Sequence, residues 1–212
     1  VMIGMVSSSA IVGAIADGLD RHKAANVVVD PVMVATSGSA LIADAAVDAL
    51  VRQLFPRATV ITPNIPEAEV LSGRAIASSE DVEAAASLIA DRCVAVWENA
   101  SDFTDAAPSV PAILIKGGHG VDEPDAADDY LRMADGESVW LRGTRIANDN
   151  THGTGCSLSS AIACGLARGF SVDVAVRDAK AYVAGALAAG LNLGRGSGLL
   201  DHMWQYGTPM PC

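Results

Sequence analysis

The sequence contains few basic residues. Its 14 Lys and Arg stand against 25 Asp and Glu, which gives a formal net charge of -11 at pH 7. Such a charge opposes binding to the phosphates of nucleic acids, and the basic residues form no cluster that would supply a hidden basic face. We therefore expect no nucleic-acid partner.

Cysteine is scarce as well. The chain has four cysteines, and they show neither a CxxC pair nor a histidine at zinc-finger spacing: Cys93, Cys156, Cys164 and Cys212. This spacing indicates neither a disulfide framework nor a structural zinc site, so the cytoplasm is the expected compartment. Cys93 and Cys164 fall within apolar patterns, and we expect both of them in the core.

Long apolar runs are absent. The longest are rich in Ala, are broken by charge or glycine, and fall short of the roughly 20 residues that span a bilayer. No basic segment precedes an apolar run as in a signal peptide, so we expect no membrane partner. The Walker motif GxxxxGK(S/T) is missing, which excludes a phosphate loop of that type. The chain begins at once with the apolar segment VMIGMV, as though it were cut from a longer protein.

The residues that are present predict a fold of alternating helices and strands. The chain has 212 residues, half of them apolar, and we expect a single domain over residues 1–212. Apolar spacing predicts helices at 7–22, about 40–54, 65–73 and 79–92, and strands within 25–33, 57–64 and 111–120. This order indicates an α/β fold with a mostly parallel sheet that is covered on both faces.

Two further segments differ from this alternation. Residues 128–143 are typical of an antiparallel hairpin that is added at the sheet edge and closed at Asp135-Gly136. Residues 96–110 lack periodicity and are acidic, which predicts a surface loop or insertion.

Polar residues follow each of the three predicted parallel strands. Asp30 ends the first, Asn64 with Glu67 follows the second, and Lys116 with two glycines ends the third. Ligands of such sheets bind beyond the carboxyl ends of the strands. The three strand ends are therefore a candidate binding site.

A glycine-rich turn, Gly153-Thr154-Gly155, precedes a predicted helix that begins near Thr154. The backbone N–H groups at a helix N-terminus attract anionic oxygens, and a phosphoryl group in transfer is the anion whose stabilisation there matters most. The turn alone is also compatible with a tightly packed connection of no chemical role. Its conjunction with the three polar strand ends favours a phosphate site.

At these residues the chain resembles a known family. The segments DPVMVATSG, ITPNIPEAEVLSG, LIKGGH and NTHGTGCSLSSAIA occur in the order found in the phosphomethylpyrimidine kinases of thiamin biosynthesis, within the ribokinase-like kinases. The resemblance extends from about Ile3 to Gly198. It implies a ribokinase-like three-layer sandwich whose N-terminal strands are missing here. It also implies a homodimeric kinase that uses ATP and Mg²⁺ to phosphorylate a pyrimidine alcohol, hydroxymethylpyrimidine, and then its monophosphate.

The resemblance also implies roles for residues of the two candidate sites. Gly153, Thr154 and Gly155 would form the anion hole for the γ-phosphate. Cys156 falls where most ribokinase-like enzymes place an Asp general base. A thiol at a helix N-terminus can have its pKa lowered, so a thiolate base and a purely steric role both stay open for Cys156.

The strand-end residues would bind the nucleotide and the metal ion. Glu67 would organise Mg²⁺ through water, with Asn64 in the same N-x-x-E element and with Asp30 assisting at the metal and the phosphates. Lys116 would lie beside the phosphates as a point charge. Nucleotide-binding roles are also implied for two glycine-loop residues, Gly118 and Thr151. Without the resemblance, Asp30 is equally typical of a turn cap, Glu67 of a solvated helix residue and Lys116 of a surface lysine.

One departure from the family is clear. The glycine-rich N-terminal segment, and the glutamine after it that reads the pyrimidine, have no counterpart in this sequence. We therefore expect either a fragment or a short form that binds MgATP but phosphorylates hydroxymethylpyrimidine slowly on its own, because the acceptor is poorly positioned. A pyridoxal-type vitamin kinase and a catalytically impaired nucleotide-binding relic are the alternatives.

Overall fold

The structure is a computed structural model. It describes residues 1–33, 44–98, 110–117, 121, 123, 125–148, 152–191 and 198–207. The chain divides into two compact units, Val1–Thr144 and Arg145–Cys212, and each is described by itself.

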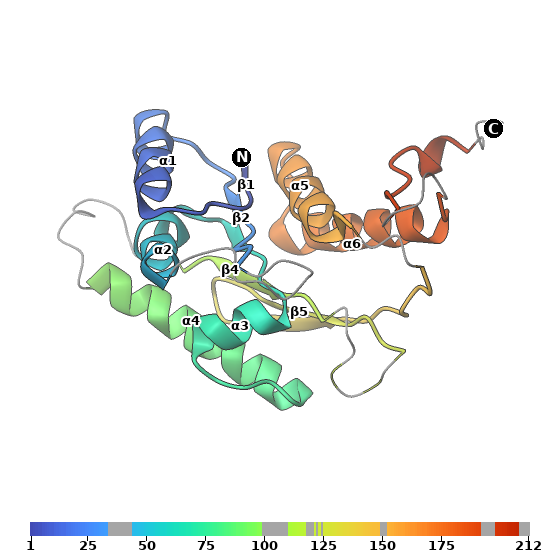
Figure 1. The fold of residues 1–212 in the computed structure, drawn as a ribbon, viewed down its shortest axis with the longest axis horizontal. Helices are drawn as coiled ribbons and strands as arrows, with labels where there is room; N and C mark the ends of the chain where they lie inside the picture. Colours follow the sequence, from blue (N-terminus) through green and yellow to red (C-terminus); the bar gives the residue numbers. More distant parts are fainter. Residues whose placement is uncertain are drawn as a thin grey trace. The chain divides into compact units, whose positions relative to one another are not determined.

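The first unit is built on a six-stranded sheet with the strand order β1-β2-β3-β4-β5-β6 (Figure 1). The strands are β1 (Met2–Ile3), β2 (Val28–Val29), β3 (Val60–Ile61), β4 (Ala112–Ile115), β5 (Asp129–Arg132) and β6 (Ser138–Leu141). The first four are parallel, and β5 and β6 are antiparallel. The mostly parallel α/β sheet with a hairpin at its edge is therefore confirmed. Gly136, at φ 92, lies in the predicted turn of that hairpin.

Both faces of this sheet are buried. Alternate residues of the strands, including Val29, Ile61 and Ile113, pack into one hydrophobic core with the helices of the first unit. The residues between them, Val28, Val60 and Leu114, point to the opposite face and are also buried. Burial on both sides explains why these strands read as continuous apolar runs rather than as alternating patterns.

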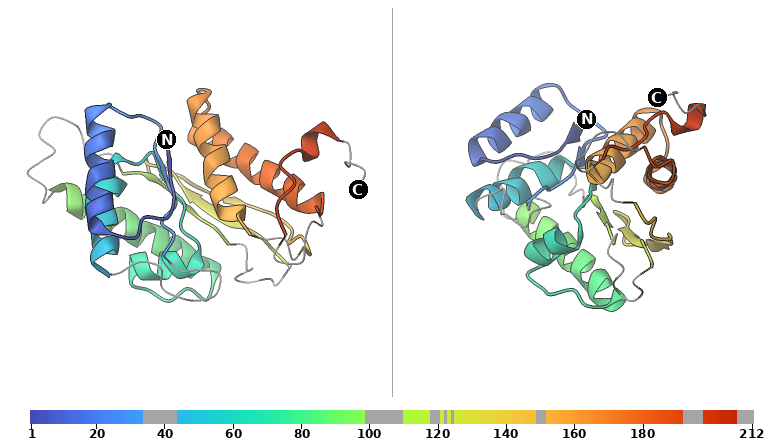
Figure 2. Two further views of the ribbon diagram at one scale, coloured as in Figure 1. Left: turned by 45° about the horizontal axis from the view of Figure 1, so that its top comes forward. Right: turned by 45° about the vertical axis from the view of Figure 1, so that its right-hand side comes forward.

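Four helices of the first unit contribute to this core (Figures 1 and 2). They are α1 (Ser9–Arg21), α2 (Asp44–Ala49), α3 (Ile65–Ser72) and α4 (Ser79–Glu98), with the π-helical η1 (Leu50–Leu54) and the short η2 (Phe55–Arg57) continuing α2. As the sequence predicts, α1 precedes β2, α2 follows β2, and α3 and α4 follow β3. The Ser8 hydroxyl caps α1 by accepting from Ile11 N, and Gly73 ends α3 at φ 70.

The predicted loop at 96–110 begins later than expected. The helix α4 continues to Glu98, so the first three residues of the segment are helical. Val96 packs against the core of the first unit, and this contact, made within the apolar residues 93–97, stabilises the helix beyond its expected end. Residues 99–109 lie outside the described part of the chain.

The second unit is a helical pair, α5 (Thr154–Ala167) and α6 (Val172–Ala188), followed by the short η3 (Trp204–Tyr206). The two long helices lie against each other (Figure 2), and Gly165 lets them approach closely, since a Cβ there would lie 2.9 Å from the Cβ of Ala175. The start of α5 at Thr154 is as predicted.

Of the two cysteines expected in the core, one is buried and the other is exposed. Cys93 is buried, and burial raises the pKa of its thiol to about 12. Cys164 was expected in the core, but it is exposed on α5. The apolar pattern around Cys164 is long enough to surround a helix, and only Leu158, Ile162 and Leu166 of that pattern turn inward.

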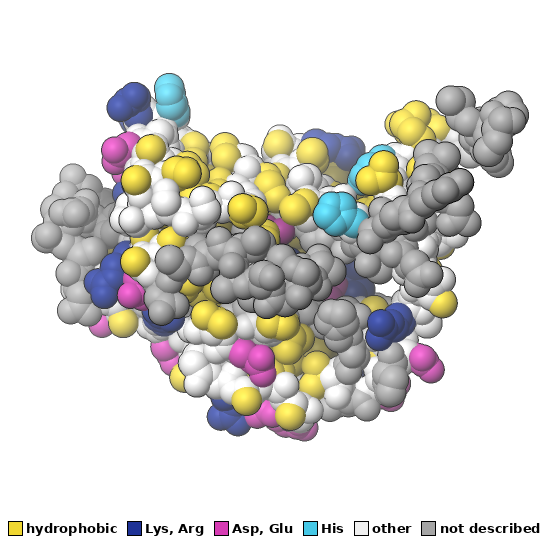
Figure 3. All heavy atoms as spheres, viewed as in Figure 1, with side chains coloured by type: hydrophobic (Ala, Val, Ile, Leu, Met, Phe, Trp, Pro, Cys, Tyr) yellow, Lys and Arg dark blue, Asp and Glu magenta, His cyan; other side chains and the backbone are white. Residues whose placement is uncertain are grey.

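The surface agrees with the acidic composition. On the face drawn in Figure 3, the described Lys and Arg side chains are scattered among acidic and apolar ones and form no continuous patch. Among the helices of the described ranges, none combines the length and the apolar character needed to cross a bilayer.

Candidate active site

Three polar side chains lie together at the carboxyl edge of the sheet. Asp30 follows β2, Thr62 follows β3 and Lys116 follows β4. The residues before them, Val29, Ile61 and Ile115, point into the core. Because side chains alternate along a strand, Asp30, Thr62 and Lys116 all point to the other face.

A buried ion pair joins two of these strand ends. Lys116 Nζ lies 2.8 Å from Asp30 Oδ1, and Asp30 is only 1% exposed. The Thr62 hydroxyl donates to the same oxygen at 3.1 Å. A buried carboxylate needs such partners, and the ammonium group has three N–H donors, of which Asp30 requires one. Lys116 can therefore hold Asp30 and still offer donors to an anion.

Glu67 lies beside this ion pair and is buried rather than solvated, at 2% exposure. It forms a capping box with Asn64. The Asn64 N–H donates to Glu67 Oε2 at 2.8 Å, and the Glu67 N–H donates to Asn64 Oδ1 at 2.9 Å. The Met33 N–H donates to Glu67 Oε1 at 3.4 Å. Glu67 thus links the start of α3 to the chain that follows Asp30.

Burial raises the pKa of the Glu67 carboxyl, while the positive charge of Lys116 opposes this effect. A raised pKa in the folded state means that folding favours the protonated carboxyl. The resulting stability is present below the ordinary pKa of 4.5 and is lost as the pH rises through the folded value. At neutral pH an ionised Glu67 therefore costs stability, and a nearby cation would reduce that cost.

In the second unit, the glycine-rich turn starts α5 as predicted. Gly153 is the N-cap residue at φ 84, a left-handed conformation that favours glycine, and it has no side chain to cap the helix. The first turn is closed by the Ser157 N–H, which donates to Gly153 O at 2.9 Å. Cys156 lies in this first turn and is exposed. The geometry is that of a helix N-terminus that suits an anion.

The structure thus brings together the four predicted residues of the first unit, Asp30, Asn64, Glu67 and Lys116. It likewise places Gly153, Thr154, Gly155 and Cys156 at the start of α5 in the second unit. Gly118 and Thr151 lie outside the described residues.

Two residues of this region carried no prediction. Thr62 binds Asp30, and Asp129 Oδ1 accepts the Gly117 N–H at 2.9 Å. A threonine at the end of a β-strand is common, so the sequence had no signal for Thr62. Asp129 had a weak one, because aspartate is disfavoured inside strands and this one falls within the predicted hairpin.

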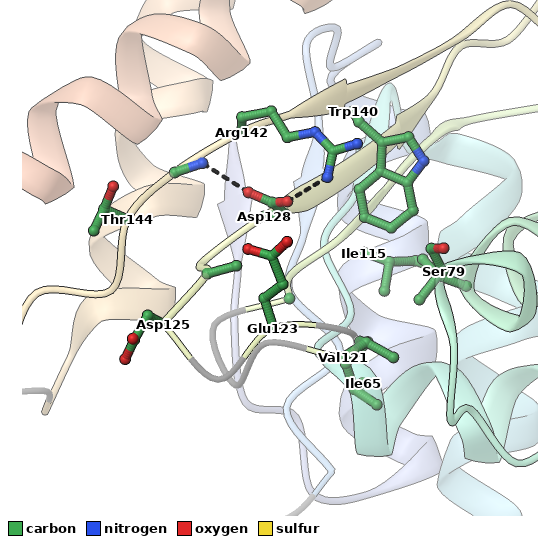
Figure 4. A pocket seen from close by; sticks show the side chains of 14 residues that line it. Ile65, Ser79, Ile115, Val121, Glu123, Asp125, Asp128, Trp140, Arg142 and Thr144 are labelled. Atoms are coloured by element: carbon green, nitrogen blue, oxygen red, sulfur yellow. Dashed lines mark hydrogen bonds and ion pairs between the residues drawn. The ribbon is translucent and has the colours of Figure 1, made fainter.

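A cavity of about 900 Å³ lies on the core side of the same sheet edge (Figure 4). Ile65, Val82, Ile115 and Trp140 supply apolar parts of its lining. Since Ile115 and Lys116 point to opposite faces of β4, this cavity does not contain the Asp30–Lys116 pair. Gly117 follows Lys116 and lines the cavity, so it borders both regions.

Gly117 has no room for a side chain, because a Cβ on it would overlap the carbonyl oxygen of Asp128. We expect Gly117→Ala to lower the free energy of unfolding by about 2 kcal/mol, the usual cost of overpacking. Gly18→Ala is the matched control. Gly18 lies in α1, a methyl group on it would meet nothing within 4 Å, and alanine should stabilise that helix by up to about 1 kcal/mol. Urea denaturation of both variants measures the effects, and equal stabilities would contradict the close approach at Gly117.

Comparison with known proteins agrees with this geometry. The sequence model of the family described as phosphomethylpyrimidine kinase matches residues 1–201. The chain belongs to the phosphomethylpyrimidine kinase family. The predicted kinase family of thiamin biosynthesis is therefore confirmed, and with it the class of enzyme, a phosphotransferase.

Individual relatives support the same family. A hydroxymethylpyrimidine/phosphomethylpyrimidine kinase of Streptomyces coelicolor is 43% identical over 208 residues, which cover 98% of this chain and 69% of the relative. The thiamine biosynthesis bifunctional protein ThiED of Geobacter sulfurreducens is 38% identical over 204 residues, which cover 96% of this chain and 38% of that protein.

A solved structure supports the fold. The ADP complex of Bacillus subtilis pyridoxal kinase matches with a TM-score of 0.79 and 29% sequence identity, over 97% of this chain and 70% of that one. The predicted ribokinase-like α/β fold is confirmed by this likeness. ADP in the neighbouring structure also agrees with the use of ATP as the phosphate donor.

Proposed function

We propose that the chain transfers the γ-phosphate of MgATP to hydroxymethylpyrimidine and then to its monophosphate. The observation that carries the proposal is the buried Asp30–Lys116 pair with Glu67 beside it, at a sheet edge within residues that match the family. In this proposal Lys116 binds the nucleotide phosphates with the two donors that Asp30 leaves. Gly153, Thr154 and Gly155 hold the transferring phosphoryl group through backbone N–H groups.

The donor set of the strand ends suits Mg²⁺ that arrives with the nucleotide. Over the described ranges, no three His, Cys, Asp or Glu side chains gather into a group that could hold a metal ion. Magnesium does not require one, since it keeps several waters and takes one or two carboxylates together with substrate phosphates. Asp30 and Glu67 would supply these carboxylates, and the bound ion would neutralise charge on the phosphates. A cation there would also relieve the cost of the buried, ionised Glu67.

Assays with three alcohols test the proposal. The purified chain is incubated with MgATP and with hydroxymethylpyrimidine, its monophosphate or pyridoxal, and the products are identified by mass spectrometry. We expect phosphorylation of both pyrimidines. Turnover of pyridoxal alone would overturn the proposal in favour of the second candidate, a pyridoxal kinase. The likeness to the Bacillus subtilis pyridoxal kinase structure supports that candidate.

A measurement of nucleotide binding distinguishes an impaired kinase from a chain that lacks the proposed nucleotide site. Titration calorimetry with the ATP analogue AMP-PCP and Mg²⁺ should show saturable binding to the chain. Binding without turnover of any of the three alcohols would indicate the nucleotide-binding relic. Absence of binding would contradict the proposed nucleotide site itself.

The proposal includes a homodimer, which the family resemblance implies, and a cytoplasmic location, which the cysteine spacing indicates. Size-exclusion chromatography with light scattering tests the first. A mass near twice 21.6 kDa is expected, and a mass near 21.6 kDa would contradict it.

A further inference from the structure

One buried carboxylate has no part in the proposed chemistry. Asp129 is the first residue of β5, next to the edge strand β6, and is only 7% exposed. Aspartate is disfavoured in strands, and a buried carboxylate costs free energy unless it is well hydrogen-bonded. Its buried position at the start of β5 therefore requires an explanation from its contacts.

The contacts of Asp129 lead to the turn that follows Lys116. Asp129 Oδ1 accepts the Gly117 N–H at 2.9 Å. The α-carbon of the same glycine lies against the carbonyl oxygen of Asp128, where no side chain would fit. On the other side, the Lys116 N–H donates to Pro63 O at 2.8 Å. The backbone of residues 116–117 is thus fixed between the start of α3 and the start of β5.

The start of β5 is itself firmly attached. The Asp128 carboxylate accepts the Gly143 N–H at 2.8 Å and an N–H of Arg142 at 2.6 Å (Figure 4). These two bonds join the beginning of β5 to the end of β6, and four pairs of residues connect the strands between them. Asp129 therefore projects from a hairpin that these bonds hold in place. Its hydrogen bond to the Gly117 N–H then fixes the glycine turn relative to the hairpin.

We propose that Asp129 is a positioning residue for nucleotide binding, which acts by holding the Gly117 N–H. The direction of the Lys116 side chain depends on the backbone at residues 116–117, and a charged acceptor holds an N–H more strongly than a neutral one. Without Asp129, the turn loses its hydrogen bond to the hairpin, and the ammonium group of Lys116 no longer keeps its place. The inference rests on the proposed nucleotide site at Lys116.

Titration of three variants with AMP-PCP and Mg²⁺ tests this role. Asp129→Ala removes the acceptor, and we expect the Kd to rise roughly tenfold, the value of one lost hydrogen bond of this kind. Asp129→Asn keeps a side-chain oxygen that can accept the same N–H, and its Kd should stay within about threefold of the wild-type value. Leu54→Ala is the control for lost stability, because Leu54 is a fully buried residue of η1, which packs with α1, α2 and α4.

The outcomes separate the inference from the function on which it rests. All proteins are measured at a temperature where denaturation curves show them folded. A raised Kd for Asp129→Ala with unchanged binding by Leu54→Ala supports the positioning role, as does a raised KM for ATP at nearly constant kcat. Equal Kd values for Asp129→Ala and wild type would overturn the inference. If the wild-type chain itself does not bind AMP-PCP, the proposed nucleotide site fails instead.

Discussion

Replacing Cys156 by serine is expected to lower kcat for hydroxymethylpyrimidine phosphorylation about 100-fold. A positioned general base is worth a factor of this order, and a serine hydroxyl of similar size does not ionise near neutral pH. Cys156 lies exposed in the first turn of α5, where the helix dipole favours an anionic side chain. Steady-state kinetics with saturating MgATP measure the change.

Two further variants show whether a loss of activity in Cys156→Ser is due to the loss of a general base. Cys164→Ser is the matched control, because Cys164 is also exposed on α5 but lies about three turns from the N-terminus of the helix, and its kcat should be unchanged. Cys156→Asp places a carboxylate where related enzymes carry their base, and it should retain more activity than the serine variant. A serine variant at full rate would leave Cys156 only a steric role in the substrate site.

Lys116→Ala is expected to destabilise the protein by about 3 kcal/mol and to weaken the binding of MgATP more than tenfold. The stability loss follows because Asp30 stays buried at 1% exposure without its counterion, and breaking a buried pair from one side costs this much. The binding loss follows from the removal of a charged donor to the phosphates. Urea denaturation and calorimetric titration measure the two effects.

A double variant separates the two roles of Lys116. Asp30→Asn combined with Lys116→Met removes both charges, so most of the stability should return while MgATP binding stays weak. Arg177→Ala is the control for an ion pair in solvent. Arg177 and Asp173 are 50% and 35% exposed, and their loss should cost less than 1 kcal/mol. A Lys116→Ala protein as stable as the wild type would show that Asp30 is not held as the structure has it.

Features that depend on neighbouring residues were predictable. The end of α3 at Gly73, the turn at Gly136 and the glycine-rich start of α5 all appear where local spacing placed them. Each of them follows from backbone conformation or from a hydrogen bond within a few residues. The polar cluster at the ends of the three parallel strands was equally predictable, because strands of one parallel sheet end at a common edge.

Features that depend on packing were not predictable. Cys164 and Cys93 have similar apolar neighbours, yet one is exposed and the other buried, since the outcome depends on which side of each helix meets a partner. The added length of α4 came from contact with the core at Val96, which the lack of periodicity in 96–110 did not indicate. The missed role of Asp129 has the same origin, because its partner Gly117 lies 12 residues away, in the turn that follows β4.

By itself, then, the sequence determined the α/β order, the position of each strand end, the turn before α5 and the kinase family, all of which reside in local patterns and short motifs. Only the tertiary structure decided what those residues do to one another. Asp30 and Lys116 are 86 residues apart, and Thr62, which binds Asp30, follows a third strand, β3. Whether a charge is buried, and which partner compensates it, depends on the segments that the fold brings together. A local sequence pattern does not contain this information.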